Sequence, residues 1–135
     1  APDALTAAAR QVAETISAAA IVTYTTTGST TLRASRERPG VPILGLSSNQ
    51  ATARRLSLAW GVHAVLTDDV ANFSEMVGRA LTAAAETGIG SSGQSLVVTA
   101  GVPFGTPGKT NSLRVVTIDG DDTPKVETVK QAVTA

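Results

Sequence analysis

The residue composition changes twice along the stretch from Ala19 to Arg38, and this restricts the folds that the chain can adopt. It begins with an apolar run rich in β-branched residues, passes through hydroxyl residues around Gly28, and continues into a basic segment of good helix formers. This order predicts a buried strand, a tight loop and a helix. The N–H groups and the dipole at the start of such a helix favour an anion, and glycine lets the backbone approach it closely.

Two interpretations of the hydroxyl loop stay open from these residues alone. Either the loop binds a phosphate, with side-chain hydroxyls as additional donors, or its Ser and Thr residues only end a strand and cap a helix. The candidate loop consists of Thr25, Thr26, Thr27, Gly28, Ser29 and Thr30. Arg33 follows on the helix and would reach a phosphate as a charge-assisted donor, although a solvated helix face explains it equally well.

Apolar strands alternate with helices along the chain. The strands are predicted at 18–24, 42–46, 62–66, 95–100 and 113–118, and the helices at 3–17, 28–38, 51–60 and 67–87. This alternation is typical of an α/β fold, here a three-layer α/β/α sandwich around a five-stranded, mostly parallel sheet. A polar turn at 119–124 and a short helix from Val126 to Val133 are expected at the end of the chain.

A second loop, from Gly101 to Asn111, is rich in Gly and Pro and also follows a predicted strand. Because ligands of such sheets bind at the carboxyl ends of strands, we expect this loop to meet the hydroxyl loop. Its Gly-Lys-Thr triplet is not a triphosphate-binding loop, since Pro103 stands where that pattern requires Gly and a strand follows instead of a helix. Lys109 and the glycine-rich backbone would still close over a ligand phosphate; otherwise the loop is an ordinary connection.

The composition excludes several classes of function. Charged residues make up 16% of the chain and the net charge is zero, which argues against a nucleic-acid partner. No apolar run approaches the roughly 20 residues that span a bilayer, so no membrane partner is expected. The absence of cysteine and of a visible signal peptide fits a cytoplasmic protein. No metal-ligand spacing is recognisable.

Candidate catalytic residues are few. The single histidine, His63, stands at the start of a strand, and a structural role is favoured because a catalytic histidine needs a positioned partner. Asp68 and Asp69 are predicted to cap the helix that follows them. No catalytic residue is therefore assigned.

The order of these motifs resembles that of the C-terminal domain of the pyruvate kinase family, from about Asp3 to Ile118. The matching segments are the strand and hydroxyl loop at 20–30, Arg-Glu-Arg-Pro at 36–39, Val-Pro-Ile-Leu at 41–44, Ala-Arg-Arg-Leu-Ser-Leu at 53–58, Trp-Gly-Val at 60–62 and the loop at 101–111. The last of these is the most specific. The resemblance implies one domain over residues 1–118 and a C-terminal extension over 119–135.

The resemblance also implies a function. In that family, phosphoryl transfer from phosphoenolpyruvate to ADP takes place in a TIM barrel that uses magnesium, potassium and ADP/ATP. None of that barrel is present in this sequence, so no cofactor is expected in this domain. The C-terminal domain carries an effector site and one of the contacts of a homotetramer. The expectation is therefore a regulatory and oligomerisation domain of pyruvate kinase.

Within that expectation, the effector phosphate lies in the hydroxyl loop and the second loop closes over it. The effector-loop residues are Gly105, Thr106, Gly108, Lys109 and Thr110. Leu32 stands where many members of the family have Arg. The Trp and Arg that hold the second phosphate of fructose 1,6-bisphosphate in eukaryotic members have no clear counterpart in residues 68–79, so the resemblance favours a sugar monophosphate or AMP over that bisphosphate. A stand-alone phosphometabolite-binding protein, and a dimerisation module whose loop is an ordinary cap, remain as alternatives.

Overall fold

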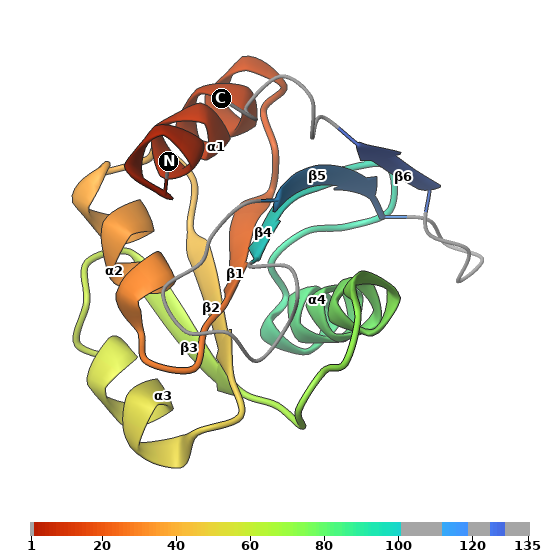
Figure 1. The fold of residues 1–135 in the computed structure, drawn as a ribbon. Coiled ribbons are helices and arrows are strands. Elements are labelled where there is room, and N and C mark those ends of the chain that lie inside the picture. Colours follow the sequence, from red (N-terminus) through yellow and green to blue (C-terminus); the bar gives the residue numbers. More distant parts are fainter. Residues whose placement is uncertain (1, 101–111, 119–124, 129–135) are drawn as a thin grey trace.

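The computed structural model describes residues 2–100, 112–118 and 125–128 (Figure 1). In chain order the elements are α1 (Pro2–Thr15), β1 (Ala20–Tyr24), α2 (Ser29–Arg36), β2 (Ile43–Ser47), α3 (Gln50–Leu56), β3 (Val62–Leu66), α4 (Phe73–Thr87), β4 (Ser95–Ala100), β5 (Ser112–Thr117) and β6 (Lys125–Thr128).

All six strands form one sheet in the order β3-β2-β1-β4-β5-β6. Strands β1 to β4 run parallel to one another, and β5 runs antiparallel to β4. The predicted α/β fold with a mostly parallel sheet of β1 to β5 and an antiparallel last strand is therefore confirmed. The sixth strand, β6, pairs antiparallel with β5.

The sequence predicted a helix from Val126 to Val133, and this prediction is wrong over residues 126–128, which belong to β6. Local pattern misled here because the segment is short and has no fixed period. Val126 and Thr128 are β-branched and suit a pleated strand, and β5 offers a row of backbone partners at its edge. The remainder of the predicted helix, 129–133, lies outside the described residues.

The helices form two layers, with α1, α2 and α3 on one face of the sheet and α4 on the other (Figure 1). Alternation along the strands divides the core between these layers. Ile21, Ile43, Val97 and Leu113 pack against α1 and α2, whereas neighbours such as Val22, Leu44, Leu96 and Val116 pack against α4. The three-layer prediction is met by this arrangement.

Two helix boundaries differ from the prediction by more than two residues. Helix α4 begins at Phe73, and Asn72 caps it by accepting a hydrogen bond from the Glu75 N–H at 3.0 Å. The Glu75 carboxylate in turn accepts from the N–H of Ala71, the residue before the cap, at 2.8 Å, which forms a variant of the capping box. Asp68 and Asp69 precede this cap and do not start the helix. Helix α3 begins at Gln50, after its cap Asn49, and ends at Leu56, short of the predicted end at Trp60.

The order of the strands creates a switch point between β1 and β4. From β1 the chain moves outward to β2 and β3, and it then returns through α4 to place β4 on the other side of β1. In doubly wound sheets the crevice outside the carboxyl ends of the strands at such a point is the usual ligand site. Here the hydroxyl loop follows β1 directly, and the 101–111 segment follows β4.

Candidate functional site

The hydroxyl loop makes a tight turn immediately after β1. The Thr25 N–H donates to the Leu46 carbonyl at 3.0 Å, so Thr25 still pairs with β2. The buried Thr25 hydroxyl then accepts a hydrogen bond from the Gly28 N–H at 2.8 Å. Gly28 has φ +98°, a left-handed conformation that glycine adopts without strain. The Thr25 hydroxyl and Gly28 therefore shape the turn.

Helix α3 holds the loop from outside. The Thr52 hydroxyl donates to the Thr26 carbonyl at 2.9 Å, and the Arg55 guanidinium donates to the Thr27 carbonyl at 3.1 Å. Asn49, the cap of α3, accepts from the Thr52 N–H at 3.0 Å and so fixes the start of this helix. Because both loop carbonyls are bound by α3, their partial negative charge is compensated, which favours an anion beside the loop.

The exposed polar groups of the loop are concentrated at the start of α2. Thr26 and Thr27 are exposed and Ser29 is half-buried. The Thr27 and Ser29 hydroxyls lie 3.3 Å apart, and the Ser29 N–H points to the Thr27 hydroxyl at 3.4 Å. The first-turn N–H groups of a helix have no partner within the helix, and Gly28 offers no side-chain cap. Thr30 is buried, with 6% of its surface exposed, so it faces the interior.

A pair of buried hydroxyls fixes α2 on the sheet below the loop. Thr23 Oγ1 of β1 and Thr31 Oγ1 of α2 are 2.7 Å apart, and both side chains are fully buried. A Cβ at Gly45 would lie only 3.0 Å from the Thr31 methyl group, so the glycine allows α2 to approach β2 closely. These contacts set the position of the first turn of α2 relative to the end of β1.

Two further buried hydroxyls lie at the ends of the strands that flank the 101–111 segment. Thr99 of β4 and Ser112 of β5 are each 1% exposed, and their hydroxyls have no hydrogen-bond partner within 2–100, 112–118 and 125–128. Thr99 is paired in register with Thr23 of β1. The predicted effector-loop residues Gly105, Thr106, Gly108, Lys109 and Thr110 lie outside the described residues, so their role stays a prediction.

The positively charged side chain that contacts the loop is Arg55 of α3, and it does not come from position 32, where the resemblance to the family suggested an Arg. Leu32 is 44% exposed on α2, so an apolar side chain occupies that position. Arg33 lies half-buried in the last turn of α2, and its predicted role remains untested. Arg55, which sequence reasoning missed, contacts the loop backbone directly. Only the docking of α3 against the loop, a tertiary contact, could have identified it.

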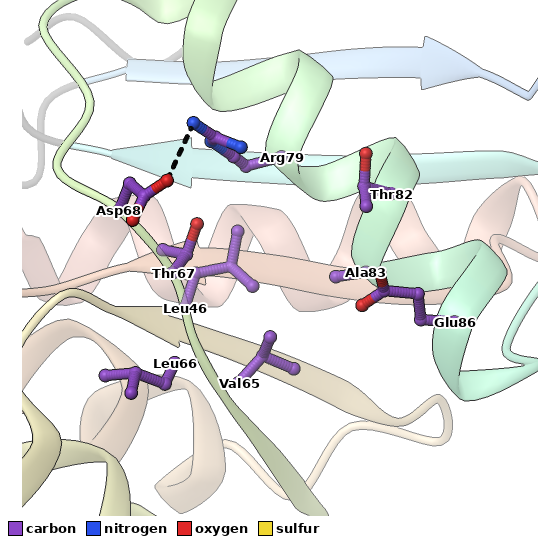
Figure 2. A pocket seen from close by; sticks show the side chains of 9 residues that line it. All are labelled: Leu46, Val65, Leu66, Thr67, Asp68, Arg79, Thr82, Ala83 and Glu86. Atoms are coloured by element: carbon purple, nitrogen blue, oxygen red, sulfur yellow. Dashed lines mark hydrogen bonds and ion pairs between the residues drawn. The ribbon is translucent and has the colours of Figure 1, made fainter.

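A second hollow, of about 200 Å³, lies on the opposite face between α4 and the ends of β2 and β3 (Figure 2). Its lining residues are Leu46, Val65, Leu66, Thr67, Asp68, Arg79, Thr82, Ala83 and Glu86. Arg79 pairs with Asp68 at 3.3 Å, and Glu86 lies at the other end of the hollow (Figure 2). With one cation against two carboxylates, this hollow suits a phosphate less well than the loop does.

The described part of the chain holds no group of three or more His, Asp or Glu side chains placed to bind a metal ion. Within the same ranges, none of the helices has the length and apolar character needed to cross a membrane. The polar site that remains is the loop at the switch point.

The fold is a doubly wound α/β domain, and the hydroxyl loop lies at its switch point. Residues 3–116 match the family model described as pyruvate kinase, alpha/beta domain. The chain belongs to the pyruvate kinase family and corresponds to this domain of it.

Individual pyruvate kinases give the same result. The chain is 42% identical to the pyruvate kinase of Methylorubrum extorquens over 115 residues, which cover 85% of this chain and 24% of that protein. It is 44% identical to one from Agrobacterium vitis, over 84% of this chain and 24% of that protein. The pyruvate kinase of Geobacillus stearothermophilus is 39% identical over 84% of the chain and 19% of its own length. The chain thus spans about a quarter or less of these curated relatives.

Proposed function

We propose that this chain is the regulatory and oligomerisation domain of a pyruvate kinase and that it binds the phosphate group of a metabolite at the loop Thr25–Thr30. The longer protein would transfer a phosphoryl group from phosphoenolpyruvate to ADP, with magnesium and potassium, at a site outside this chain. The effector would regulate that reaction. The single observation that carries the proposal is the shape of the loop after β1, whose carbonyls are bound by α3 and whose exposed hydroxyls stand at the start of α2.

The chemistry of the loop supports a phosphate as its ligand. Thr27 and Ser29 supply hydroxyl donors next to the first-turn N–H groups of α2, and the helix dipole favours negative charge there. The guanidinium of Arg55, 3.1 Å from the Thr27 carbonyl, adds positive charge at the same loop. Because α3 and the Thr23–Thr31 hydroxyl pair hold the loop in place, little conformational entropy is lost when the ligand binds.

The same surroundings favour a ligand with one phosphate. Leu32 offers no charge at the position where many family members have Arg, and residues 68–79 hold no clear counterpart of the Trp and Arg that bind a second phosphate in eukaryotic members of the family. A second phosphate would therefore find less compensation than the first. We infer that a sugar monophosphate or AMP binds in preference to fructose 1,6-bisphosphate, with Gly105 to Thr110 closing over it.

Isothermal titration calorimetry of the intact chain tests the proposal. The ligands are a hexose monophosphate, AMP, fructose 1,6-bisphosphate and inorganic phosphate. Thr27→Asp places a negative charge among the exposed donors and should abolish binding, because like charges repel at short range. Thr27→Ser keeps the hydroxyl and is the matched control, which should bind like the unmodified chain.

Thr27 is the appropriate position because it is exposed, so the substitution leaves the core unchanged. An Asp at the buried Thr30 would instead destabilise the fold. Absence of heat with every ligand would contradict the proposed site in this chain. Equal affinity of Thr27→Asp and Thr27→Ser would move the site away from the loop.

A further inference from the structure

The guanidinium of Arg55 reaches the hydroxyl loop from α3 with only part of its hydrogen-bonding capacity in use. Its Nη2 atom donates to the Thr27 carbonyl at 3.1 Å and to the Thr52 hydroxyl at 3.3 Å. A guanidinium has five N–H donors in a rigid fork. The donors on Nε and Nη1 have no partner among the described residues, and the side chain is exposed. Arg55 is thus held beside the loop with donors available for a ligand.

The same contact places the positive charge of Arg55 next to the exposed hydroxyls of the loop. The carbonyl that it binds belongs to Thr27, whose hydroxyl lies 3.3 Å from that of Ser29 at the start of α2. The preceding residue, Arg54, is exposed as well, but no hydrogen bond joins its side chain to the loop in the part of the chain that the structure describes. Successive residues of a helix point about 100° apart. Arg55 is therefore the arginine of α3 that a phosphate in the loop would meet.

The side chains that surround the loop carry charge of one sign only. Residues 25–36 and 49–56, which form the loop with α2 and α3, include four arginines and no Asp, Glu or His. The first carboxylate after α2, that of Glu37, pairs with Arg10 of α1 at 3.4 Å. Because the attraction between charges grows with the charge on each partner, a ligand with two negative charges is compensated better here than a ligand with one.

We propose that Arg55 binds the ligand phosphate directly, and that the loop thereby selects the dianion of a terminal phosphate group. The inference rests on the proposed phosphate site at Thr25–Thr30 and names the class of its ligand. Charge-assisted hydrogen bonds from a guanidinium are stronger than neutral ones, and Arg55 supplies a charge that Leu32 lacks. A terminal phosphate has a second pKa of about 6 and passes from a single to a double negative charge around that pH. A sulfate ester has the same terminal oxygens but keeps one negative charge.

The pH dependence of binding reports this selection, because the side chains that ordinarily change charge near that pH lie elsewhere. Histidine is the side chain that does so, and the only one, His63, shares a face of the sheet with Leu44, which packs against α4. Asp69 contacts the Tyr24 hydroxyl at 3.5 Å on the same α4 side. Affinity for a phosphate monoester should therefore rise about tenfold from pH 5 to pH 7, as the dianion fraction rises from about 0.1 to about 0.9. Affinity for the sulfate ester should stay constant.

Calorimetric titration of the intact chain with a hexose monophosphate and with the corresponding hexose sulfate tests the proposal over this range of pH. Arg55→Gln and Arg54→Gln form a matched pair, because each removes one positive charge from successive positions of α3. Arg55→Lys keeps the charge but not the planar fork. A loss of loop geometry alone would lower affinity by the same factor at every pH, so the pH profile separates ligand binding by Arg55 from a structural role.

For Arg55→Gln we expect a phosphate affinity at least about fivefold lower at neutral pH, and a rise with pH of less than about threefold. Arg54→Gln should stay within about twofold of the unmodified chain and keep its pH profile. Arg55→Lys should have an intermediate affinity and keep the rise with pH. The unmodified chain should bind the sulfate ester at least about fivefold more weakly than the phosphate ester at neutral pH.

Three results would overturn the proposal and leave the loop as the site, provided that Thr27→Asp still abolishes binding. The first is an unchanged affinity and pH profile in Arg55→Gln. The second is an equal loss in Arg55→Gln and Arg54→Gln, because long-range charge alone would explain it. The third is equal affinity of the unmodified chain for the phosphate and sulfate esters. A chain that binds neither ester would overturn both this proposal and the proposed function.

Discussion

Gly28→Ala measures how much the loop depends on its left-handed turn. Gly28 has φ +98°, further into positive φ than the left-handed helical region that other residues occasionally adopt. An added Cβ would lie 3.4 Å from Leu56 Cδ2 and 3.6 Å from Thr52 Cγ2, which are ordinary contacts. The expected cost is therefore backbone strain alone, about 2 kcal/mol of unfolding free energy, at the upper end of the range for a left-handed residue.

Gly61→Ala provides the control for this prediction. Gly61 also has a positive φ, +69°, but nothing lies within 4 Å of its added Cβ and it is remote in sequence from the loop. Because +69° is closer to the left-handed region, its expected cost is smaller, about 1 kcal/mol. Urea denaturation of both variants and calorimetric titration with a hexose monophosphate measure stability and binding. Gly28→Ala should lower both, whereas Gly61→Ala should lower stability alone.

The reasoning about Gly28 fails if Gly28→Ala unfolds at the same urea concentration as the unmodified chain. Equal loss of ligand affinity in Gly28→Ala and Gly61→Ala would also contradict the prediction, because the ligand would then not depend on the geometry of the loop. Gly28→Asn offers an internal check. Asn tolerates positive φ better than Ala, so this variant should retain more stability than Gly28→Ala.

Three other substitutions test the contacts around the loop. Thr23→Val leaves the buried Thr31 hydroxyl without its partner at 2.7 Å and should lower the unfolding free energy by about 1–3 kcal/mol. In a double-mutant cycle by urea denaturation, Thr23→Val/Thr31→Val should lower it by less than the sum of the two single changes. Additive values would refute the coupling. Asn49→Ala removes the cap of α3 and should lower the unfolding free energy by about 1 kcal/mol, with faster amide exchange at Thr52; an unchanged exchange rate would refute it. Thr52→Val removes the bond to the Thr26 carbonyl and should weaken phosphate binding several-fold in calorimetry, whereas unchanged affinity would show that α3 does not position the loop.

The parts of the fold that are set by local sequence could be predicted. The apolar run before Thr25, the glycine at 28 and the helix formers after it each favour one local conformation, and these agree with the structure. The strand alternation also predicted that the loops after β1 and β4 follow the carboxyl ends of strands at one edge of the sheet, and the structure adds that these two strands are neighbours.

The parts that depend on tertiary contacts could not be predicted. Arg55 belongs to the loop only because α3 docks beside it, and no spacing in the sequence links position 55 to position 27. Asp68 and Asp69 look like caps, but the capping box of Asn72 and Glu75 starts the helix a turn later. β6 forms because β5 offers it an edge, and four residues are too few to carry a periodic signal of their own.

The most direct test of the central claim is an NMR titration of the intact, isotope-labelled chain with a hexose monophosphate and with AMP. We expect saturable shifts of the backbone amides of Thr27, Gly28 and Ser29, and no such shifts in Thr27→Asp. Unperturbed loop amides at millimolar ligand would contradict it. So would shifts confined to the hollow around Asp68 and Arg79 on the opposite face.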